Sequence, residues 1–263
     1  MLYHYTSIES LGLILKNKTL CFSSLGIVDD PDEEEGYAGE IVNLGRSIYV
    51  SCWTCERQES IPMWEQYSGK SHGVRIGLPD LPFKRFSSKE MGIEPAGGNQ
   101  DWLFNVLEFQ DKYNITFPVN IIVKNVEYTD DEALIHPNVS TEIQNDRYIS
   151  DGEKSVSFGK MGAYKKQCWC FQNETRYLLY TLPRIDDVTN DDEFRRAVKT
   201  LKNPNWKPDT DRLFIGLDEF ALSQIDIVRG PKMSDGERHL LDCLLKEHKI
   251  ASSQCHDSTI RIR

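Results

Sequence analysis

The segment WCFQNETRYLLY, residues 169–180, carries polar side chains at alternate positions and then becomes apolar. Taken as a β-strand, its period of two places Gln172, Glu174 and Arg176 on one face. A solvent-exposed row explains this pattern simply, because an exposed glutamate–arginine pair contributes about 0.2–1 kcal/mol. The apolar run 177–180 instead favours a central strand, where such a row would line a cleft.

Length and composition are typical of a folded protein with a sizeable core. The chain has 263 residues, of which 39% are hydrophobic. A chain of this length buries roughly 75% of its unfolded surface. It contains no apolar run near the roughly 20 residues of a membrane span, and its first residues do not resemble a signal peptide. We therefore expect a single cytoplasmic domain over residues 1–263.

The charge balance excludes broad nucleic-acid or membrane surfaces. With 31 basic and 41 acidic residues, the formal charge is −10, which repels phosphate backbones and anionic lipids. A local basic pocket remains compatible with this balance, since Lys160, Lys165, Lys166 and Arg176 lie close together in sequence. The acidic run 29–35 predicts a solvated loop, with a divalent-metal or partner site as the alternative.

The cysteine pattern favours reduced thiols. Seven cysteines are an odd number in a chain too large to need disulfides. The pairs Cys52/Cys55 and Cys168/Cys170 would supply four thiolates for zinc, but the second pair has one intervening residue where structural sites have two to four. We therefore expect buried apolar thiols and no metal site.

Strands and helices are predicted in irregular alternation. The hydrophobic pattern predicts strands at 2–5, 19–23, 47–53, 73–78, 119–128, 176–181, 212–216, 224–228 and 258–263. It predicts helices after a capping box at 6–9, at 62–67, within 142–166, at 191–201 and at 234–248. The resulting fold class is α+β, with a mixed, mainly antiparallel, split β-sheet core flanked by helices. Prolines and glycines predict an irregular insertion at 79–118.

A second group of candidate residues lies near the N-terminus. His4 ends the first predicted strand directly before a helix, where a hydrogen-bonded structural histidine is the simpler interpretation. Several residues able to hydrogen-bond to or stack on a planar ligand lie in the same quarter of the chain, which favours a binding site. They are Tyr5, Ser23, Ser51, Trp64 and Tyr67.

Motifs over most of the chain resemble the bacterial family catalogued as domain of unknown function 2971. In order, they are LYHYT (2–6), LCFSS (20–24), DDPDE (29–33), YVSCW (49–53), MWEQY (63–67), GVRI (73–76), WCFQNETR (169–176) and IVRGP (227–231). The tryptophan-to-arginine motif is the most specific of these. Glu174 and Arg176 agree with the family, which usually has a glutamate at the position of Gln172.

The His-Tyr-Thr start and the Gln-x-Glu motif are also similar to those of ADP-ribosyltransferases. This resemblance implies an ADP-ribosyltransferase-like fold with NAD as substrate. It implies that His4 contacts a ribose, that Tyr5 or Trp64 stacks on nicotinamide, and that Glu174 binds the ribose 2′-hydroxyl. The expected NAD-binding residues are His4, Tyr5, Thr6, Ser51, Trp64, Tyr67 and Arg176.

The chemistry of such a site is coherent. Loss of nicotinamide leaves an oxocarbenium-like ribose, which the carboxylate of Glu174 would stabilise. Gln172 would orient an acceptor that is already polar, because an amide is no general base. The guanidinium of Arg176, Arg46 or Arg75 would hold the pyrophosphate.

Three functions follow as hypotheses. The first is an NAD-dependent ADP-ribosyltransferase-like protein, such as a bacterial toxin or defence effector, with Glu174, Gln172 and His4 as catalytic residues. The second is a non-catalytic module that binds a nucleotide or a protein at the same pocket. The third is a metal-dependent nuclease using carboxylates such as Asp30, Glu33 and Glu174, although the sequence has no spaced ligand set that requires a metal. The first two require His4 and Glu174 to share one cleft.

Overall fold

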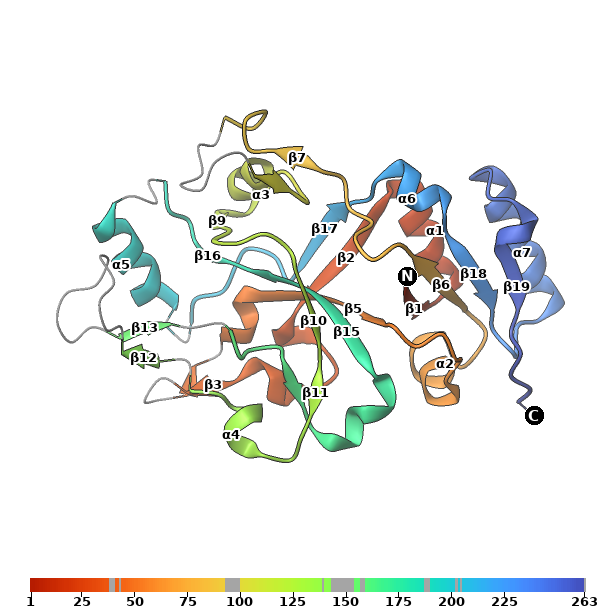
Figure 1. Cartoon of the computed structure of the whole chain (residues 1–263), viewed down its shortest axis with the longest axis horizontal. Helices are drawn as coiled ribbons and strands as arrows, with labels where there is room; N and C mark the ends of the chain where they lie inside the picture. The colour runs from red at the N-terminus through yellow and green to blue at the C-terminus, as the bar shows by residue number, and fades with distance from the viewer. Residues whose placement is uncertain are drawn as a thin grey trace.

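The computed structural model describes residues 1–37, 41–42, 44–92, 100–138, 140–142, 154–156, 159–186, 190–201, 203 and 205–262. These residues form a mixed α+β structure with a mainly antiparallel open sheet flanked by helices (Figure 1), which confirms the predicted fold class at this level. No helix in the described ranges is long and apolar enough to cross a membrane.

The main sheet contains most of the long strands. Its central order is β10-β15-β5-β1-β6-β18-β19, and β2 joins β17 to β5 outside this order. All pairs are antiparallel except β18 with β19. The strands are β1 (Leu2–Thr6), β2 (Thr19–Ser24), β5 (Ile48–Thr54), β6 (Val74–Leu78), β10 (Ile122–Asn125), β15 (Glu174–Tyr180), β17 (Arg212–Gly216), β18 (Asp226–Arg229) and β19 (Cys255–Asp257).

The sheet divides along one edge of β5. Near the end of β5, Thr54 pairs with Tyr3 of β1, whereas near its start Val50 pairs with Ser23 of β2. Residues 51–53 therefore face the point at which β1 and β2 diverge. We call this point the fork.

Short two-stranded sheets accompany the main one. Their pairs are β3 (Gly36–Tyr37) with β4 (Ile41–Val42), β7 (Phe86–Ser87) with β8 (Asp101–Trp102), β9 (Ile115–Thr116) with β16 (Leu182–Pro183), β11 (Glu127–Tyr128) with β14 (Tyr164–Lys165), and β12 (Ser140–Glu142) with β13 (Lys154–Val156).

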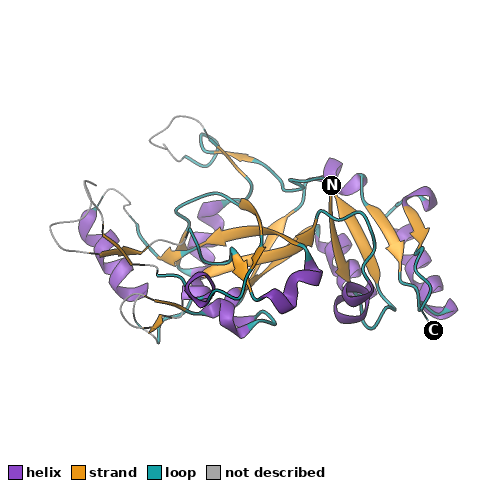
Figure 2. Ribbon diagram, turned by 60° about the horizontal axis from the view of Figure 1, so that its bottom comes forward, coloured by secondary structure: helices purple, strands orange, loops and turns teal. Residues whose placement is uncertain are grey.

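Seven helices are described around the sheet, and α5 and α7 lie at its opposite ends (Figure 2). Ser7 caps α1 one residue later than predicted, and its side chain accepts a hydrogen bond from the backbone amide of Ser10. The predicted cap of α7 is confirmed, since Ser234 and Glu237 form a complete capping box. The helices are α1 (Ile8–Asn17), α2 (Ile61–Tyr67), α3 (Val106–Tyr113), α4 (Glu132–Ile135), α5 (Asp191–Leu201), α6 (Glu219–Ser223) and α7 (Asp235–Glu247).

Strand β15 is an interior, buried strand of the sheet, as its apolar run favoured. It lies between β10 and β5, and every one of its residues is buried. The ring of Tyr177 packs edge-on against Phe83, with 4.9 Å between ring centroids, and against Trp53 at 6.0 Å. Strand β15 therefore carries charged residues at its start and an aromatic anchor of the core, Tyr177, further along.

The prediction that Gln172, Glu174 and Arg176 share one strand is wrong for Gln172. Residues Gln167–Gln172 form a 3₁₀ helix, and Asn173 follows with a left-handed φ of 40°. Strand β15 starts only at Glu174. Gln172 is therefore not on the strand that carries Glu174 and Arg176, although the turn returns it to their side.

Three other predictions meet mixed outcomes. The insertion at 79–118 is not irregular throughout, because it contains α3 with an Asn105 cap. The final strand is β19, Cys255–Asp257, and residues 258–262 form none. A helix was expected somewhere within 142–166. Most of this range, residues 143–153 and 157–158, lies outside the described residues.

Candidate functional site

A pocket opens between β1, β5 and β15, beside the fork. Its cavity volume is about 80 Å³, and about 500 Å³ when the open space at its mouth is counted. His4 of β1 and Glu174 of β15 both line it, so the structure brings together the two residues that the sequence expected to meet. The lining residues are Tyr3, His4, Tyr5, Val28, Asp29, Cys52, Trp53, Met63, Tyr67, Lys165, Gln172, Glu174 and Arg176.

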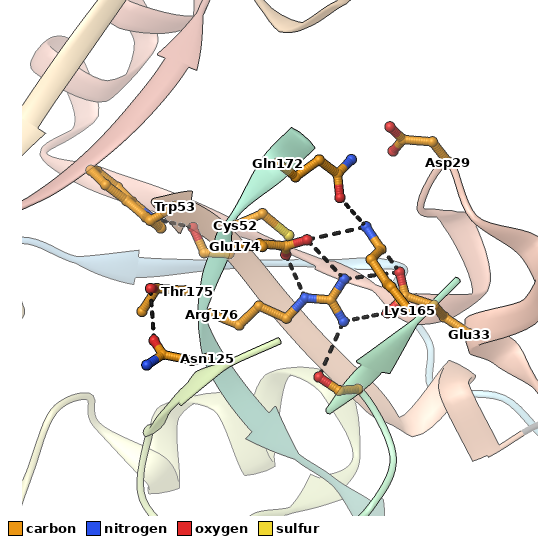
Figure 3. A network of polar contacts seen from close by, with 12 residues as sticks. Asp29, Glu33, Cys52, Trp53, Asn125, Lys165, Gln172, Glu174, Thr175 and Arg176 are labelled. Atoms are coloured by element: carbon orange, nitrogen blue, oxygen red, sulfur yellow. Dashed lines mark hydrogen bonds and ion pairs between the residues drawn. The ribbon is translucent and has the colours of Figure 1, made fainter. Parts of the chain in front are cut away.

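Four buried charges form a network beside the pocket (Figure 3), and three of them, Lys165, Glu174 and Arg176, line it. Arg176 is completely buried and donates to both Glu174 and Glu33, with 3.1 Å from Nη2 to Oε2 of Glu174 and 2.9 Å from Nη2 to Oε1 of Glu33. Lys165 lies 3.1 Å from Glu174 and 3.3 Å from Glu33. Two carboxylates thus balance two cations, which offsets the cost of removing these charges from water.

This pairing fixes the ionisation of Glu174. Burial alone would raise its pKa, but the charges of Arg176 and Lys165 lower the pKa of the carboxyl to about 2. The thiol of Cys52 also contributes to the lowering of this pKa. Burial likewise opposes the charge of Lys165, yet Glu174 and Glu33 raise the pKa of its ammonium. Glu174 is therefore a carboxylate and Lys165 a cation at neutral pH.

The main chain is shaped around Arg176. Its Nη1 lies 3.2 Å from the carbonyl oxygen of Gly162. Gly162 has a φ of +68°, and a Cβ there would lie 2.9 Å from a methyl group of Leu178. Glycine is therefore required at this close approach, because any side chain would strain the turn and collide with β15.

A chain of hydrogen bonds of fixed direction leads from these charges to the pocket mouth. Lys165 Nζ donates to Gln172 Oε1 at 2.8 Å, so the amide group of Gln172 donates to the hydroxyl oxygen of Tyr67. That hydroxyl donates to Asp29 Oδ2 at 2.7 Å. An ammonium only donates and a carboxylate only accepts, so each donor in this chain is determined.

His4 is held as a neutral hydrogen-bond acceptor. Its Nδ1 lies 2.7 Å from the carbonyl oxygen of Cys52, and a carbonyl can only accept, so Nδ1 carries the proton. Burial lowers the pKa of the imidazole, although the bond to Cys52 opposes this shift. The other ring nitrogen, Nε2, is then unprotonated. It can accept a hydrogen bond from a ligand hydroxyl.

Aromatic and apolar groups form the rest of the pocket. The ring of Trp53 lies 5.1 Å from that of His4. Tyr3, Tyr5 and Tyr67 add three more rings. A planar ligand with hydroxyl groups suits this combination of rings, one neutral acceptor and two carboxylates, Asp29 and Glu174.

Several expected ligand-binding residues lie elsewhere. Trp64 is fully buried behind Tyr5 and donates its Nε1–H to Glu59, so it does not line the pocket. Thr6 and Ser51 line a separate cleft at the fork. This fork cleft is formed by His4, Thr6, Ser10, Leu13, Ile14, Asn17, Thr19, Leu20, Cys21, Ser51, Trp53, Arg212 and Phe214.

The expected pyrophosphate-binding arginines are engaged otherwise. The guanidinium of Arg176 is used by Glu33 and Glu174. Arg46 pairs with Glu34, and Arg75 stacks on the ring of Tyr3 at 4.6 Å. Neither Arg46 nor Arg75 lines the pocket, and Arg176 faces it only as part of the buried ion network.

The acidic partner of Arg176 was not predicted from the sequence. The run 29–35 was expected to be a solvated loop, but residues Pro31–Glu34 form a 3₁₀ helix that buries Glu33, and Asp30 is also buried. Asp29 reaches the pocket mouth. The signal was available in principle, because a guanidinium on a central strand requires carboxylates to balance it.

The thiols also differ from expectation. Cys55, Cys168 and Cys170 are exposed, Cys52 is half-buried, and none is in a disulfide. Within the described ranges, no group of three or more His, Cys, Asp or Glu side chains is arranged to hold a metal ion.

No family model, no curated protein and no solved structure matches the chain.

Proposed function

We propose that the pocket binds NAD and that the chain cleaves its nicotinamide–ribose bond, as a protein of ADP-ribosyltransferase-like fold and activity. One observation supports this most. A neutral imidazole from β1 and an ionised carboxylate from β15, 170 positions apart in the chain, line a single aromatic pocket. The family resemblance would make the protein a bacterial toxin or defence effector.

Each group has a distinct role in this proposal. The bond between ribose C1′ and the nicotinamide nitrogen breaks, and its electron pair leaves with the ring, which becomes neutral. The carboxylate of Glu174 accepts a hydrogen bond from a ribose hydroxyl and stabilises the positive charge that develops at C1′. Nε2 of His4 accepts a hydrogen bond from a second hydroxyl. The rings of Trp53 and Tyr67, in place of the buried Trp64, hold the nicotinamide.

Gln172 favours an acceptor that needs no strong base. Its carbonyl oxygen accepts a hydrogen bond from Lys165, and its amide group donates a hydrogen bond to Tyr67. Neither end of the amide can remove a proton at neutral pH. The nucleophile that attacks C1′ is then water or an acceptor that is already polar, and its proton passes to solvent.

Arg176 acts as a positioning residue and not as a ligand for phosphate. Both of its outer nitrogens are used by Glu33, Glu174 and the Gly162 carbonyl. It orients the carboxylate of Glu174 and keeps it ionised. In this proposal Arg176 makes no contact with the pyrophosphate.

Incubation of the purified chain with NAD tests the proposal. We expect NAD to raise the melting temperature and free nicotinamide to accumulate, as resolved by liquid chromatography. His4→Ala should retain the fold and lose most of the release, because Nε2 is absent. A control variant, His256→Ala, changes a histidine that pairs with Asp226 outside the pocket and should release nicotinamide normally. No thermal shift and no nicotinamide from the wild type would overturn the proposal.

A second candidate is a binding module without turnover. It is favoured by the balance of charge around Glu174, since Arg176 and Lys165 reduce the negative potential that the carboxylate presents to the pocket. This candidate predicts that NAD or a related nucleotide raises the melting temperature while nicotinamide stays bound in intact NAD.

A further inference from the structure

A second hollow, the fork cleft, lies at the fork. It shares only His4 and Trp53 with the pocket. The fork cleft has a cavity volume of about 520 Å³, and about 1100 Å³ when the open space at its mouth is counted. Its floor is the part of β5 that pairs with β15 on one edge and with neither β1 nor β2 on the other. There, Ser51 Oγ accepts a hydrogen bond from Trp53 Nε1 at 3.0 Å. One side is α1, and the other is the face of β2 and β17.

The walls of the fork cleft are apolar and partly open to solvent. On α1, the residues at positions 10, 13, 14 and 17 share one helix face, in which Leu13 is 54% exposed. On the opposite side, Phe214 pairs with Cys21 across β17 and β2, so both side chains point to the same face. Phe214 is 52% exposed. Two large exposed apolar side chains facing one hollow indicate a ligand surface.

Charge distinguishes this cleft from the pocket. Of the described residues that line it, Arg212 alone carries a formal charge at neutral pH. No ion pair or side-chain hydrogen bond of its guanidinium occurs within the described ranges. The whole chain has a net charge of −10, so an unpaired cation beside apolar walls is a local exception. A guanidinium binds carboxylates, sulfonates and phosphates through several donors.

We propose that the fork cleft is a binding site for a small monoanion that carries an aromatic or alkyl group. The apolar group lies between Leu13 and Phe214, and the anionic group pairs with Arg212. The hydroxyl and amide groups of Ser10, Asn17 and Thr19 are available for any further polar atom of the ligand. This inference does not depend on the proposed cleavage of NAD.

The fork cleft and the pocket share His4 and Trp53. A ligand in the cleft therefore contacts the same imidazole that faces the pocket. Its binding changes the surroundings of His4 without contact with Glu174, which lines only the pocket. The site is thus placed to act on whatever the pocket binds.

Two dyes test the ligand class. We use 8-anilinonaphthalene-1-sulfonate, an aromatic monoanion that fluoresces when bound, and N-phenyl-1-naphthylamine, which has the same rings without the sulfonate. Arg212→Gln should weaken binding of the anion about tenfold and leave the neutral dye unchanged. Arg85→Gln removes one exposed positive charge outside the cleft and should change neither. Equal weakening by the two variants, or none with Arg212→Gln, would overturn the proposal.

Cys21 reports the location of the bound dye. Its thiol lines the cleft, whereas the exposed Cys243 lies on α7 outside it. Saturating sulfonate dye should slow alkylation of Cys21 by iodoacetamide several-fold and leave Cys243 unchanged, as mapped by mass spectrometry. At the same dye concentration, Arg212→Gln should show weaker protection of Cys21. Equal alkylation of Cys21 with and without dye would contradict the proposed site.

A second copy of the chain is the competing occupant. If this face formed a dimer, sedimentation would show a concentration-dependent assembly that Phe214→Ser dissociates, and the dye would compete with it. That result would overturn the assignment to a small anion. A monomer at all concentrations, with dye binding as described, supports it.

Discussion

Nη2 of Arg176 lies 2.9 Å from Oε1 of Glu33, 143 positions earlier in the chain. The same guanidinium contacts Glu174 on its own strand. Arg176 therefore joins the acidic segment after β2 to the centre of the sheet. Through this link the fold holds the carboxylate of Glu174 against the pocket.

Arg176→Met should destabilise the fold strongly. The substitution leaves Glu33 and Glu174 buried with Lys165 as their remaining cation, and breaking a buried ion pair costs about 3–5 kcal/mol of unfolding free energy. Urea unfolding measures the change. Arg184→Gln, which removes a surface arginine, should stay within about 0.5 kcal/mol of the wild type. Equal effects of the two variants would contradict the described network.

Glu174 should make the fold less stable in acid. Its pKa is lowered from 4.5 to about 2 in the folded state, so the unfolded chain takes up the proton first. The stabilising contribution is complete above pH 4.5 and is lost as the pH falls toward 2. Its size is on the order of 3 kcal/mol.

The matched comparison for this pH dependence uses Glu174→Gln. Urea unfolding at pH 5.5 and pH 2.5 should show a smaller loss of stability in the variant than in the wild type. Glu237, whose pKa hydrogen bonds from His72 and the Ser234 amide also lower to about 2, remains in both proteins, so its contribution cancels. Identical losses in the two proteins would show that Glu174 is not held ionised by its neighbours.

His4 should titrate below its ordinary pKa of 6.5, because burial disfavours the imidazolium. As the pH falls below 6.5, the unfolded chain binds this proton first, so stability decreases. Nuclear magnetic resonance of labelled imidazoles measures both pKa and tautomer, and His4→Asn identifies the signal. A pKa above 6.5, or a proton on Nε2, would contradict the acceptor role of His4.

The thiols should react in two classes with iodoacetamide. Cys55, Cys168 and Cys170 are exposed and should be alkylated rapidly. Burial raises the pKa of Cys52 well above its ordinary value and that of Cys255 to about 11, so their thiolate fractions are small. We expect both to react at least about tenfold more slowly, as followed by mass spectrometry. Rapid alkylation of Cys52 in the folded protein would be inconsistent with its place beside Glu174.

Local patterns in the sequence predicted the elements whose signals are local. The capping box at Ser234 gives α7, and the alternation around Leu213 gives β17 at its predicted bounds, 212–216. Asn173 was missed because its left-handed turn has no apolar signature. That one residue moves Gln172 from a strand to a 3₁₀ helix.

Only the site residues that belong to recognisable sequence motifs could be predicted. His4 and Glu174 stood out through their motifs, and the structure places both at the pocket. Glu33, Lys165 and Trp53 were not assigned to it, because their roles depend on contacts between distant segments. The burial of Glu33 follows from Arg176 on β15, and an acidic run alone cannot show this.

The most direct measurement compares nicotinamide release from NAD by Glu174→Gln and Glu33→Gln. Both variants remove one carboxylate from Arg176, but only Glu174 lines the pocket. Melting temperatures of the two variants measure the structural cost that they share. We predict that Glu174→Gln lowers release by at least about a hundredfold, whereas Glu33→Gln at a temperature where it is folded retains release within about tenfold of the wild type. Equal release by the two variants would contradict the role of Glu174 in the cleavage.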